Sequence, residues 1–404
     1  MTKDSKKSLL CTDFPLYSVQ CFGGQHFIAA GGGGAAKTGI PNAIEAFEIT
    51  HLDKYRCEYE GLNRTLTDDL VADKNEAIMN GAVSQWKLKE RSVYFAAGMN
   101  NQCTVFEVYK EPNKTAKYVG AVEVCDAKAG YQTSVGWAHD NSSIITADST
   151  GGVSVWNFPS LEMKVRIAAH KSEVEWMAIN PISHTAVTCG RDGSMLELNL
   201  DKGEIENDLF WTSEEVHMKS YRCRACCYAF VNHDRSKLKL FSVHIPKVMK
   251  NKQKSHLFLV KWDSRLLPER KALLPQTDTP SCLATSIDGN FLGVGSLEGH
   301  VSIYISFSLK CVKRVEFAHS SFVTGIVFAP VTFPDTSNGK REIMQSRLFT
   351  DFDAVLLSIS IDKQVNCIAL PQRTTLSVGV AMLFCFAVVL LVGVGIAFGA
   401  VLNL

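Results

Sequence analysis

Short apolar runs separated by turn residues make up most of the chain before its C-terminal end. Two consecutive units, residues 134–157 and 174–198, share the order strand, turn, strand, hairpin turn, strand. Gly152 and Gly193, in the hairpin turns of these units, are 41 residues apart. Four-stranded units with a period of about 40–45 residues are typical of propeller blades.

The same pattern recurs along the chain. Further hairpins are predicted at residues 27–49, 96–108, 291–304 and 355–368. One more blade, with an insertion at residues 246–256, fills the long interval between Gly193 and Gly299. We therefore predict an all-β fold, a seven-bladed WD40-like β-propeller.

Three further features bear on how the blades connect. We expect one early strand to complete the last blade, and residues 14–19 form an early strand-like run. Residues 51–81 are rich in acidic side chains and are interpreted as a solvated connection. The insertion at 246–256 is basic, which suits either a solvated hairpin tip or contact with anionic lipid or an acidic partner surface.

Degenerate traces of the WD repeat support the propeller. Trp156-Asn157 and Trp262-Asp263 resemble the WD dipeptide that ends a blade strand. His170 and His319 stand where a histidine opens a blade. The repeat is therefore degenerate but present.

The C-terminal segment has a different pattern. Residues 374–404 contain no charged side chain, and residues 378–402 are dominated by Val, Leu, Ala, Phe and Gly. About 20 apolar residues span a bilayer core as a helix. We therefore predict a cytosolic propeller at residues 1–373 and one transmembrane helix at residues 376–402. Residues 1–7 are polar and basic and do not resemble a signal sequence.

Composition excludes several classes of function. The net charge is +1, which provides no overall field to attract nucleic acid, and we predict no nucleic-acid partner. The 13 cysteines have no regular spacing, which favours buried free thiols in a reducing compartment. Neither a Gly-x-Ser-x-Gly elbow nor a His-Glu-x-x-His motif occurs, so covalent catalysis is not indicated.

A glycine-rich stretch at residues 31–42, called the glycine loop below, interrupts the first predicted hairpin. Glycine is used where the backbone takes positive φ or approaches another group closely. The stretch nearly fits the phosphate-loop pattern G-x-x-x-x-G-K-[ST], with Ala36 replacing the second glycine. A phosphate loop must begin a helix, and Gly39-Ile40-Pro41 disfavours one. We expect this loop to present backbone to another molecule.

Two stretches carry a family resemblance. The first comprises residues 29–34 (Ala-Ala-Gly-Gly-Gly-Gly) with residues 38–42 (Thr-Gly-Ile-Pro-Asn), and residues 318–325 support it. With the predicted architecture, they resemble the prolactin regulatory element-binding protein family. Its members are guanine-nucleotide exchange factors of the endoplasmic reticulum membrane, acting on the Sar-type small GTPase that starts COPII coat assembly. The resemblance implies the same function, partner and single-pass location, with the N-terminal domain in the cytosol.

The resemblance also implies a site. In the family the glycine loop contacts the GTPase and is organised around a potassium ion, which backbone carbonyls can coordinate. The implied GTPase-binding residues are Gly31, Gly32, Gly33, Gly34, Lys37, Thr38, Gly39, Ile40, Pro41 and Asn42. Asn42 is implied to promote exchange, since an amide both donates and accepts hydrogen bonds. From the residues alone, the favoured interpretation of Asn42 is instead a turn residue that caps the loop.

Two alternatives belong to other functional classes. A tail-anchored WD-repeat scaffold would gather coat proteins without exchange activity. A DNA-binding role, suggested by the family name, is disfavoured by the near-zero net charge and the predicted anchor.

Overall fold

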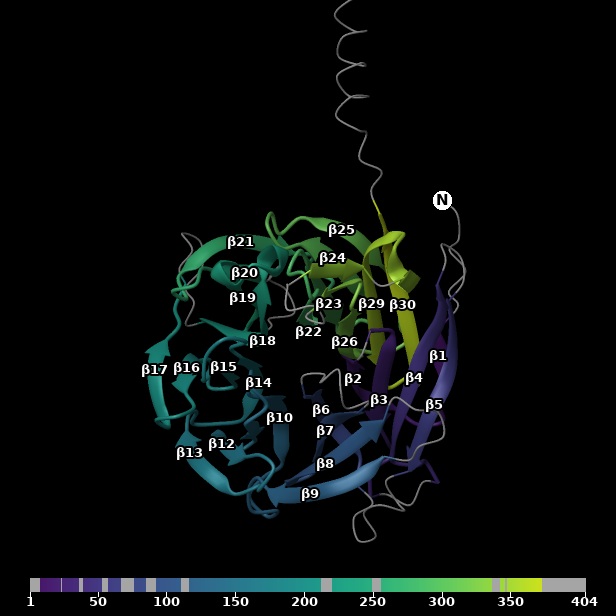
Figure 1. Cartoon of the computed structure of the whole chain (residues 1–404). Helices are drawn as coiled ribbons and strands as arrows, with labels where there is room; N and C mark the ends of the chain where they lie inside the picture. Colours follow the sequence, from purple (N-terminus) through teal and green to yellow (C-terminus); the bar gives the residue numbers. More distant parts are fainter. Residues whose placement is uncertain are drawn as a thin grey trace, which may run out of the picture. The chain divides into compact units, whose positions relative to one another are not determined.

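The protein is a ring of seven four-stranded antiparallel sheets, seen in a computed structural model (Figure 1). The structure describes residues 8–22, 24–35, 39–52, 57–66, 76–84, 92–109, 116–211, 220–248, 256–335, 342–345 and 347–372. Each sheet is one blade, with its first strand innermost. The predicted seven-bladed propeller is confirmed.

The first four blades each use four consecutive strands. Blade one contains β2 (Leu16–Phe22), β3 (His26–Gly31), β4 (Ala43–Leu52) and β5 (Cys57–Leu66). Blade two contains β6 (Ile78–Val83), β7 (Ser92–Met99), β8 (Gln102–Tyr109) and β9 (Lys117–Glu123). Blade three contains β10 (Gln132–Trp137), β11 (Ser143–Asp148), β12 (Gly152–Asn157) and β13 (Met163–Ala168). Blade four contains β14 (Val174–Ile179), β15 (Thr185–Gly190), β16 (Met195–Asn199) and β17 (Glu204–Asp208).

The last three blades follow the same plan until the ring closes. Blade five contains β18 (Tyr221–Phe230), β19 (Leu238–Pro246), β20 (Leu257–Trp262) and β21 (Pro268–Leu274). Blade six contains β22 (Pro280–Thr285), β23 (Phe291–Ser296), β24 (Val301–Ile305) and β25 (Cys311–Val315). Blade seven contains β26 (Val323–Ala329), β29 (Phe352–Ser360), β30 (Gln364–Pro371) and β1 (Leu10–Cys11). A separate hairpin joins β27 (Thr332–Asp335) to β28 (Glu342–Gln345), and the 3-10 turns are η2 (Val231–His233), η3 (Arg235–Lys237) and η4 (Arg347–Phe349).

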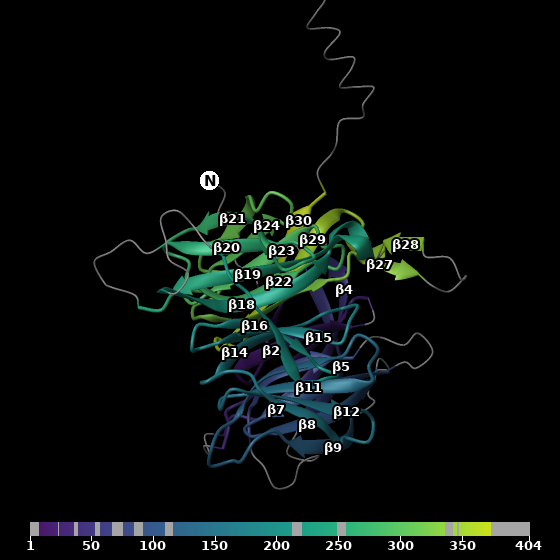
Figure 2. The same ribbon diagram turned by 90° about the vertical axis from the view of Figure 1, so that its left-hand side faces the viewer.

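The ring is closed by pairing the two ends of the propeller. Strand β1 pairs with β30, with Leu10 opposite Val365, so an early strand completes the last blade as expected. The strand-like run at 14–19 has a different place, because it leads into β2, the innermost strand of blade one. Neighbouring inner strands contact one another around the whole ring, including β26 against β2 (Figures 1 and 2).

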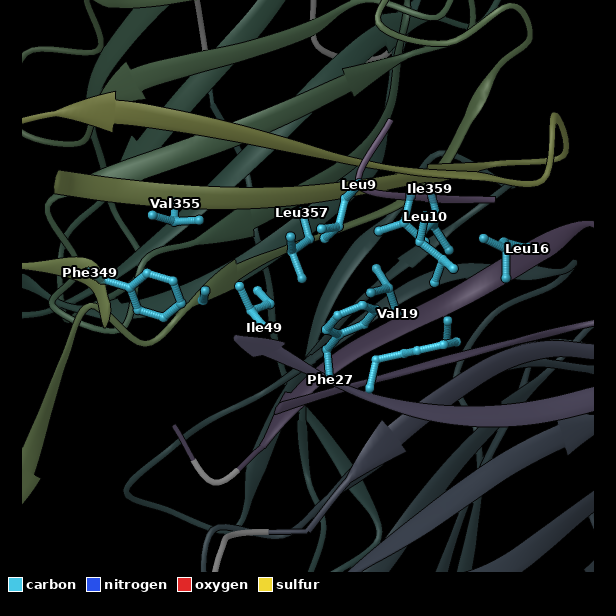
Figure 3. Close-up of a cluster of buried hydrophobic side chains, with 14 of the residues drawn as sticks. Leu9, Leu10, Leu16, Val19, Phe27, Ile49, Phe349, Val355, Leu357 and Ile359 are labelled. Carbon is cyan, nitrogen blue, oxygen red and sulfur yellow. The ribbon is translucent and has the colours of Figure 1, made fainter. Parts of the chain in front are cut away.

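A continuous apolar cluster fills the closure between blades one and seven (Figure 3). Phe27 of β3 and Leu357 of β29 are fully buried in it. Phe27 also stacks on Phe47 of β4, with ring centroids 5.2 Å apart. Truncating a buried core phenylalanine to alanine costs about 3–5 kcal/mol. This core fixes blade one, and with it the base of the glycine loop.

The WD-like residues form hydrogen bonds inside the blades. The indole Nε1–H of Trp156 donates to Thr146 Oγ1 at 2.9 Å, and that of Trp262 donates to Ser242 Oγ at 2.7 Å. Each bond joins two adjacent strands inside one blade. His170 is likewise buried, with Nε2 2.9 Å from Thr188 Oγ1, and burial lowers its pKa below the usual value.

Two predictions about connecting segments have different outcomes. Residues 51–81 were expected to be a solvated connection, which is wrong, because they include β5 and the start of β6. Such strands are hard to recognise where acidic residues interrupt the alternation. The insertion at 246–256 does lie between β19 and β20, and most of it lies outside the described residues.

The predicted membrane anchor also lies outside the described residues, which end at 372. Within the described part of the chain, no helix is long and apolar enough to cross a membrane. Contacts divide the chain into one unit of Met1–Leu370 and a second of Pro371–Leu404.

Candidate functional site

The glycine loop connects β3 to β4, the two middle strands of blade one, at one end of the blade. The two strands pair up to Gly31 and Ala43, and the chain then leaves the sheet. At this point the backbone N–H of Gly32 donates to the carbonyl of Pro15 at 3.0 Å. A Cβ atom on Gly31 would lie only 1.9 Å from the same carbonyl oxygen. Glycine is therefore required where the loop starts, because no side chain fits against the Pro15 backbone.

The two arms of the loop pack directly against each other. The backbone N–H of Gly34 donates to Asn42 Oδ1 at 2.9 Å. A Cβ on Gly32 would lie 2.0 Å from that oxygen, and a Cβ on Gly33 would lie 2.7 Å from Ile40 Cβ. The glycines allow a close approach of the arms, and the Asn42 side chain bridges them.

The outer glycines have a different role. Gly34 and Gly39 have φ values of +75° and +76°, and a Cβ on either would meet no atom within 4 Å. Left-handed backbone costs other residues roughly 1–2 kcal/mol, so these glycines turn the chain at the outer part of the loop. Lys37 and Thr38, both predicted to contact the GTPase, lie outside the described residues.

Asn42 is buried, with only 3% of its surface exposed. Its amide oxygen is engaged inside the loop by Gly34. The structure therefore places Asn42 as a positioning residue that sets the shape of the loop. This geometry agrees with the capping interpretation of Asn42 and gives it a route to influence a bound partner.

A hollow of about 360 Å³ lies beside the loop. Gly32, Gly33 and Gly34 form one wall of it. The remaining lining comes from the neighbouring inner strands and from turns at the same end of the blades: Tyr17, Glu76, Ala77, Met79, Asn100, Tyr131 and Gln132. Tyr131 is 47% exposed and offers an aromatic surface next to the loop.

No sequence pattern singles out the residues that line this hollow. Tyr131 immediately precedes β10, whereas Asn100 sits in the β7–β8 turn with a φ of +53°. They reach the loop only because blade two is packed beside blade one and blade three beside blade two. A turn-forming Asn and an aromatic residue after Gly130 are weak signals that many surface turns share.

The second motif, residues 318–325, supports the closure of the ring. His319 is buried, with Nδ1 3.1 Å from Asp362 Oδ1 and Nε2 2.9 Å from Ser358 Oγ. Thr324 Oγ1 donates to the carbonyl of Leu16 at 2.7 Å. Leu16 is the strand partner of Gly31. The two motifs that carry the family resemblance are therefore linked through β2, and the second acts as a support for the first.

The described residues of the glycine loop can be compared with the oxygen ligands that the implied potassium ion requires. Its described residues contain no Cys, His, Asp or Glu, so the ligand atoms available are neutral backbone and amide oxygens. Neutral carbonyl oxygens are the donors used for potassium in channel filters. The close approach of the arms at Gly32 and Asn42 places one such oxygen, Asn42 Oδ1, at the loop base. The residues present therefore fit the implied ion.

Comparison with known proteins supports the resemblance. The chain is 27% identical over 426 residues to the guanine nucleotide-exchange factor SEC12 of Rattus norvegicus, covering 93% of this chain and 94% of the relative. The SEC12 of Mus musculus is 27% identical over 429 residues, with the same coverage. The family resemblance is confirmed. Both relatives are named as guanine nucleotide-exchange factors, which is the activity that the resemblance implies.

A shorter similarity involves another class of protein. The guanine nucleotide-binding protein subunit beta of Saccharomyces cerevisiae is 27% identical over 138 residues, which cover 31% of this chain and 32% of the relative. No protein-family profile matches the chain. The SEC12 similarity is the one that spans both the glycine loop and the 318–325 motif, because it covers nearly the whole chain.

Proposed function

We propose that this protein is a guanine-nucleotide exchange factor that releases GDP from a Sar-type small GTPase and so starts COPII coat assembly. The observation that carries the proposal is the similarity to SEC12 over 93% of the chain. The construction of the glycine loop supports it, because every described glycine of the loop has either a close backbone approach or a positive φ. Such a loop holds a defined shape without using bulky side chains.

An exchange factor makes and breaks no covalent bond. It binds the nucleotide-free GTPase more tightly than the loaded form, and reciprocity requires that it weakens nucleotide binding by the same factor. The glycine loop is the element proposed to favour the nucleotide-free form. The Asn42–Gly34 hydrogen bond holds it in shape before the partner arrives, which lowers the entropy lost on binding.

The hollow beside the loop supplies a second contact for the GTPase. Tyr131 and Met79 are about half exposed at its rim. Exposed aromatic residues are enriched where interfaces gain most of their binding energy. We assign affinity mainly to this hollow and nucleotide release mainly to the loop.

A potassium ion is part of the proposal. The backbone oxygens of residues 31–42 would hold it, and its charge would draw the two arms of the loop together. Asn42 Oδ1, which lies between the two arms of the loop, would be the one side-chain oxygen of the described loop residues at this position.

The proposed location is the endoplasmic reticulum membrane. Residues 376–402 would form the single membrane-spanning helix and leave the propeller in the cytosol. The uncharged composition of this segment supports the assignment. Anchoring would keep the exchange activity on the membrane where the coat assembles.

The experiment that tests the function measures release of fluorescent GDP from a Sar-type GTPase when the full-length chain is added. We expect concentration-dependent acceleration in potassium buffer and slower exchange in sodium buffer. Binding of the GTPase without faster release would instead support the scaffold alternative.

A further inference from the structure

A cluster of histidine and carboxylate side chains lies at the end of the blades away from the glycine loop. His139 and Asp140 lie in the turn between β10 and β11, and His184 lies in the turn between β14 and β15. These turns join the first and second strands of blades three and four. The glycine loop joins the second and third strands of its blade, so the two kinds of turn lie at opposite ends of the ring.

The potential ligand atoms converge between the two blades. One side-chain ligand atom from each of His139, Asp140 and His184 lies within 4.8 Å of the other two. His184 Nε2 is 3.6 Å from Asp140 Oδ2. Ligands held about 2.0–2.1 Å from one tetrahedral zinc ion are about 3.3 Å apart. The observed separation of the two atoms is too long for a good hydrogen bond. It is close to the distance between two ligand atoms of one tetrahedral zinc ion.

A carboxylate behind His184 sets the orientation of its ring. His184 Nδ1 is 3.3 Å from Asp201 Oδ1, and the same oxygen accepts from Lys164 Nζ at 2.6 Å. An Nδ1–H donated to Asp201 leaves the Nε2 lone pair directed towards Asp140. A carboxylate partner behind the ligating histidine is the usual support of a protein metal site.

Asp140 is held just as firmly. Its Oδ1 accepts from both the backbone N–H and the hydroxyl of Ser142, at 3.0 and 2.7 Å. These bonds fix the turn and leave Oδ2 on the side of His184. The ring of His139 packs edge-on against His184, with centroids 4.8 Å apart. His184 and Asp140 are partly exposed, which gives an ion access from solvent.

We propose that His139, Asp140 and His184 bind a divalent first-row transition-metal ion of the zinc class. Two imidazoles and one carboxylate are a donor set that zinc, cobalt and nickel accept, whereas calcium and magnesium prefer oxygen ligands alone. The ion would link blade three to blade four through these side chains. Its fourth coordination position would remain for water or for a side chain of a partner. Asp201 is a positioning residue for His184.

The test is a titration of untagged, full-length chain with Co²⁺ in a thiol-free reductant after removal of metal by a chelator. We expect one equivalent to give a visible absorption band of tetrahedral intensity, displaced by Zn²⁺. His139→Asn and His184→Asn each abolish the band. Asp201→Asn weakens affinity about 10–100-fold. His256→Asn, which lies outside the cluster, is the matched control and leaves the band unchanged.

Folding is checked by thermal unfolding of every variant in EDTA, where all midpoints should equal that of the wild type. Added Zn²⁺ should then raise the midpoint of the wild type and of His256→Asn, leave the midpoints of His139→Asn and His184→Asn unchanged, and raise that of Asp201→Asn only at about 10–100-fold higher Zn²⁺. The proposal is overturned if the wild-type protein does not bind one equivalent of Co²⁺ tightly. A band that persists in His184→Asn, or a thiolate-to-cobalt charge-transfer band, also overturns it, since either assigns the ion to other residues. GDP release by the metal-free protein is a separate readout that this result does not decide.

Discussion

Asn42 Oδ1 accepts a hydrogen bond from the backbone N–H of Gly34 at 2.9 Å, across eight residues of the glycine loop. This bond joins the last residue of the loop, before β4, to the arm of the loop that follows β3. It places a buried side chain, rather than an exposed one, in control of the loop shape. In the proposed function, Asn42 therefore acts on the GTPase through the backbone that it positions.

Replacing Asn42 by alanine should open the loop and slow nucleotide release. The variant loses the bond to Gly34, which costs about 1 kcal/mol of stability, so the propeller itself should remain folded. Misplacement of the loop should lower the exchange rate by about ten- to a hundredfold. Stopped-flow measurement of GDP release checks the rate, and urea unfolding checks the fold.

The control for this variant is Lys310→Ala, an exposed position in the turn between β24 and β25, at the other end of the blades. It should exchange at the wild-type rate. Equal rates in Asn42→Ala and Lys310→Ala would show that the shape of the loop is not used in exchange.

Two neighbouring glycines should respond differently to alanine. Gly32→Ala places a Cβ 2.0 Å from Asn42 Oδ1, whereas Gly34→Ala meets no atom within 4 Å and carries only the strain of its positive φ. We expect Gly32→Ala to lose most exchange activity and Gly34→Ala to lose about tenfold or less, the equivalent of roughly 1–2 kcal/mol. The reverse order, measured by GDP release, would contradict the close packing of the arms.

Tyr131→Ala should weaken binding of the GTPase more than the maximal exchange rate. Tyr131 lines the hollow next to the loop and is 47% exposed. Tyr118, which is 44% exposed on the outer strand β9, gives a matched control. We expect the GTPase concentration for half-maximal rate to rise in Tyr131→Ala only. Identical behaviour of the two variants would remove the hollow from the interface.

Stability should fall as the pH drops below about 6.5. Burial lowers the pKa of His244 to about 3 and also lowers the pKa of His170 and His319. Below the unfolded-state pKa of about 6.5, the unfolded chain binds more protons than the folded one, so acid favours unfolding. Each buried histidine that stays neutral in the folded protein lowers the free energy of unfolding by up to about 1.4 kcal/mol for each pH unit below 6.5.

Urea unfolding between pH 6.5 and 5 measures this slope, in a range above the titration of most carboxylates. His244→Asn should reduce the slope. A free energy of unfolding that stays constant over this range would show that these histidines are protonated in the folded protein.

The propeller was predictable because its signals are local and repeated. Turn glycines at a spacing of 41 residues, such as Gly152 and Gly193, mark blades without any knowledge of contacts. The closing strand Leu10–Cys11 was not identified, because a two-residue strand has no periodicity to detect. Its place is set by pairing with β30, more than 350 residues away in the chain.

The site was predictable in part. The glycines of the loop indicate special backbone, but the sequence does not show which of them face Pro15, which face Asn42 and which are open. The hollow and the His139–His184 cluster combine residues from different blades. Their members have ordinary spacings in sequence, so only the three-dimensional arrangement brings them together.

The most direct test of the central claim is the rate of GDP release from a Sar-type GTPase as a function of added full-length chain in potassium buffer. Our account predicts a rate that rises with concentration, saturates, and falls back towards the intrinsic rate when Asn42→Ala is used at the same concentration. A wild-type chain that binds the GTPase and leaves GDP release at its intrinsic rate would contradict it.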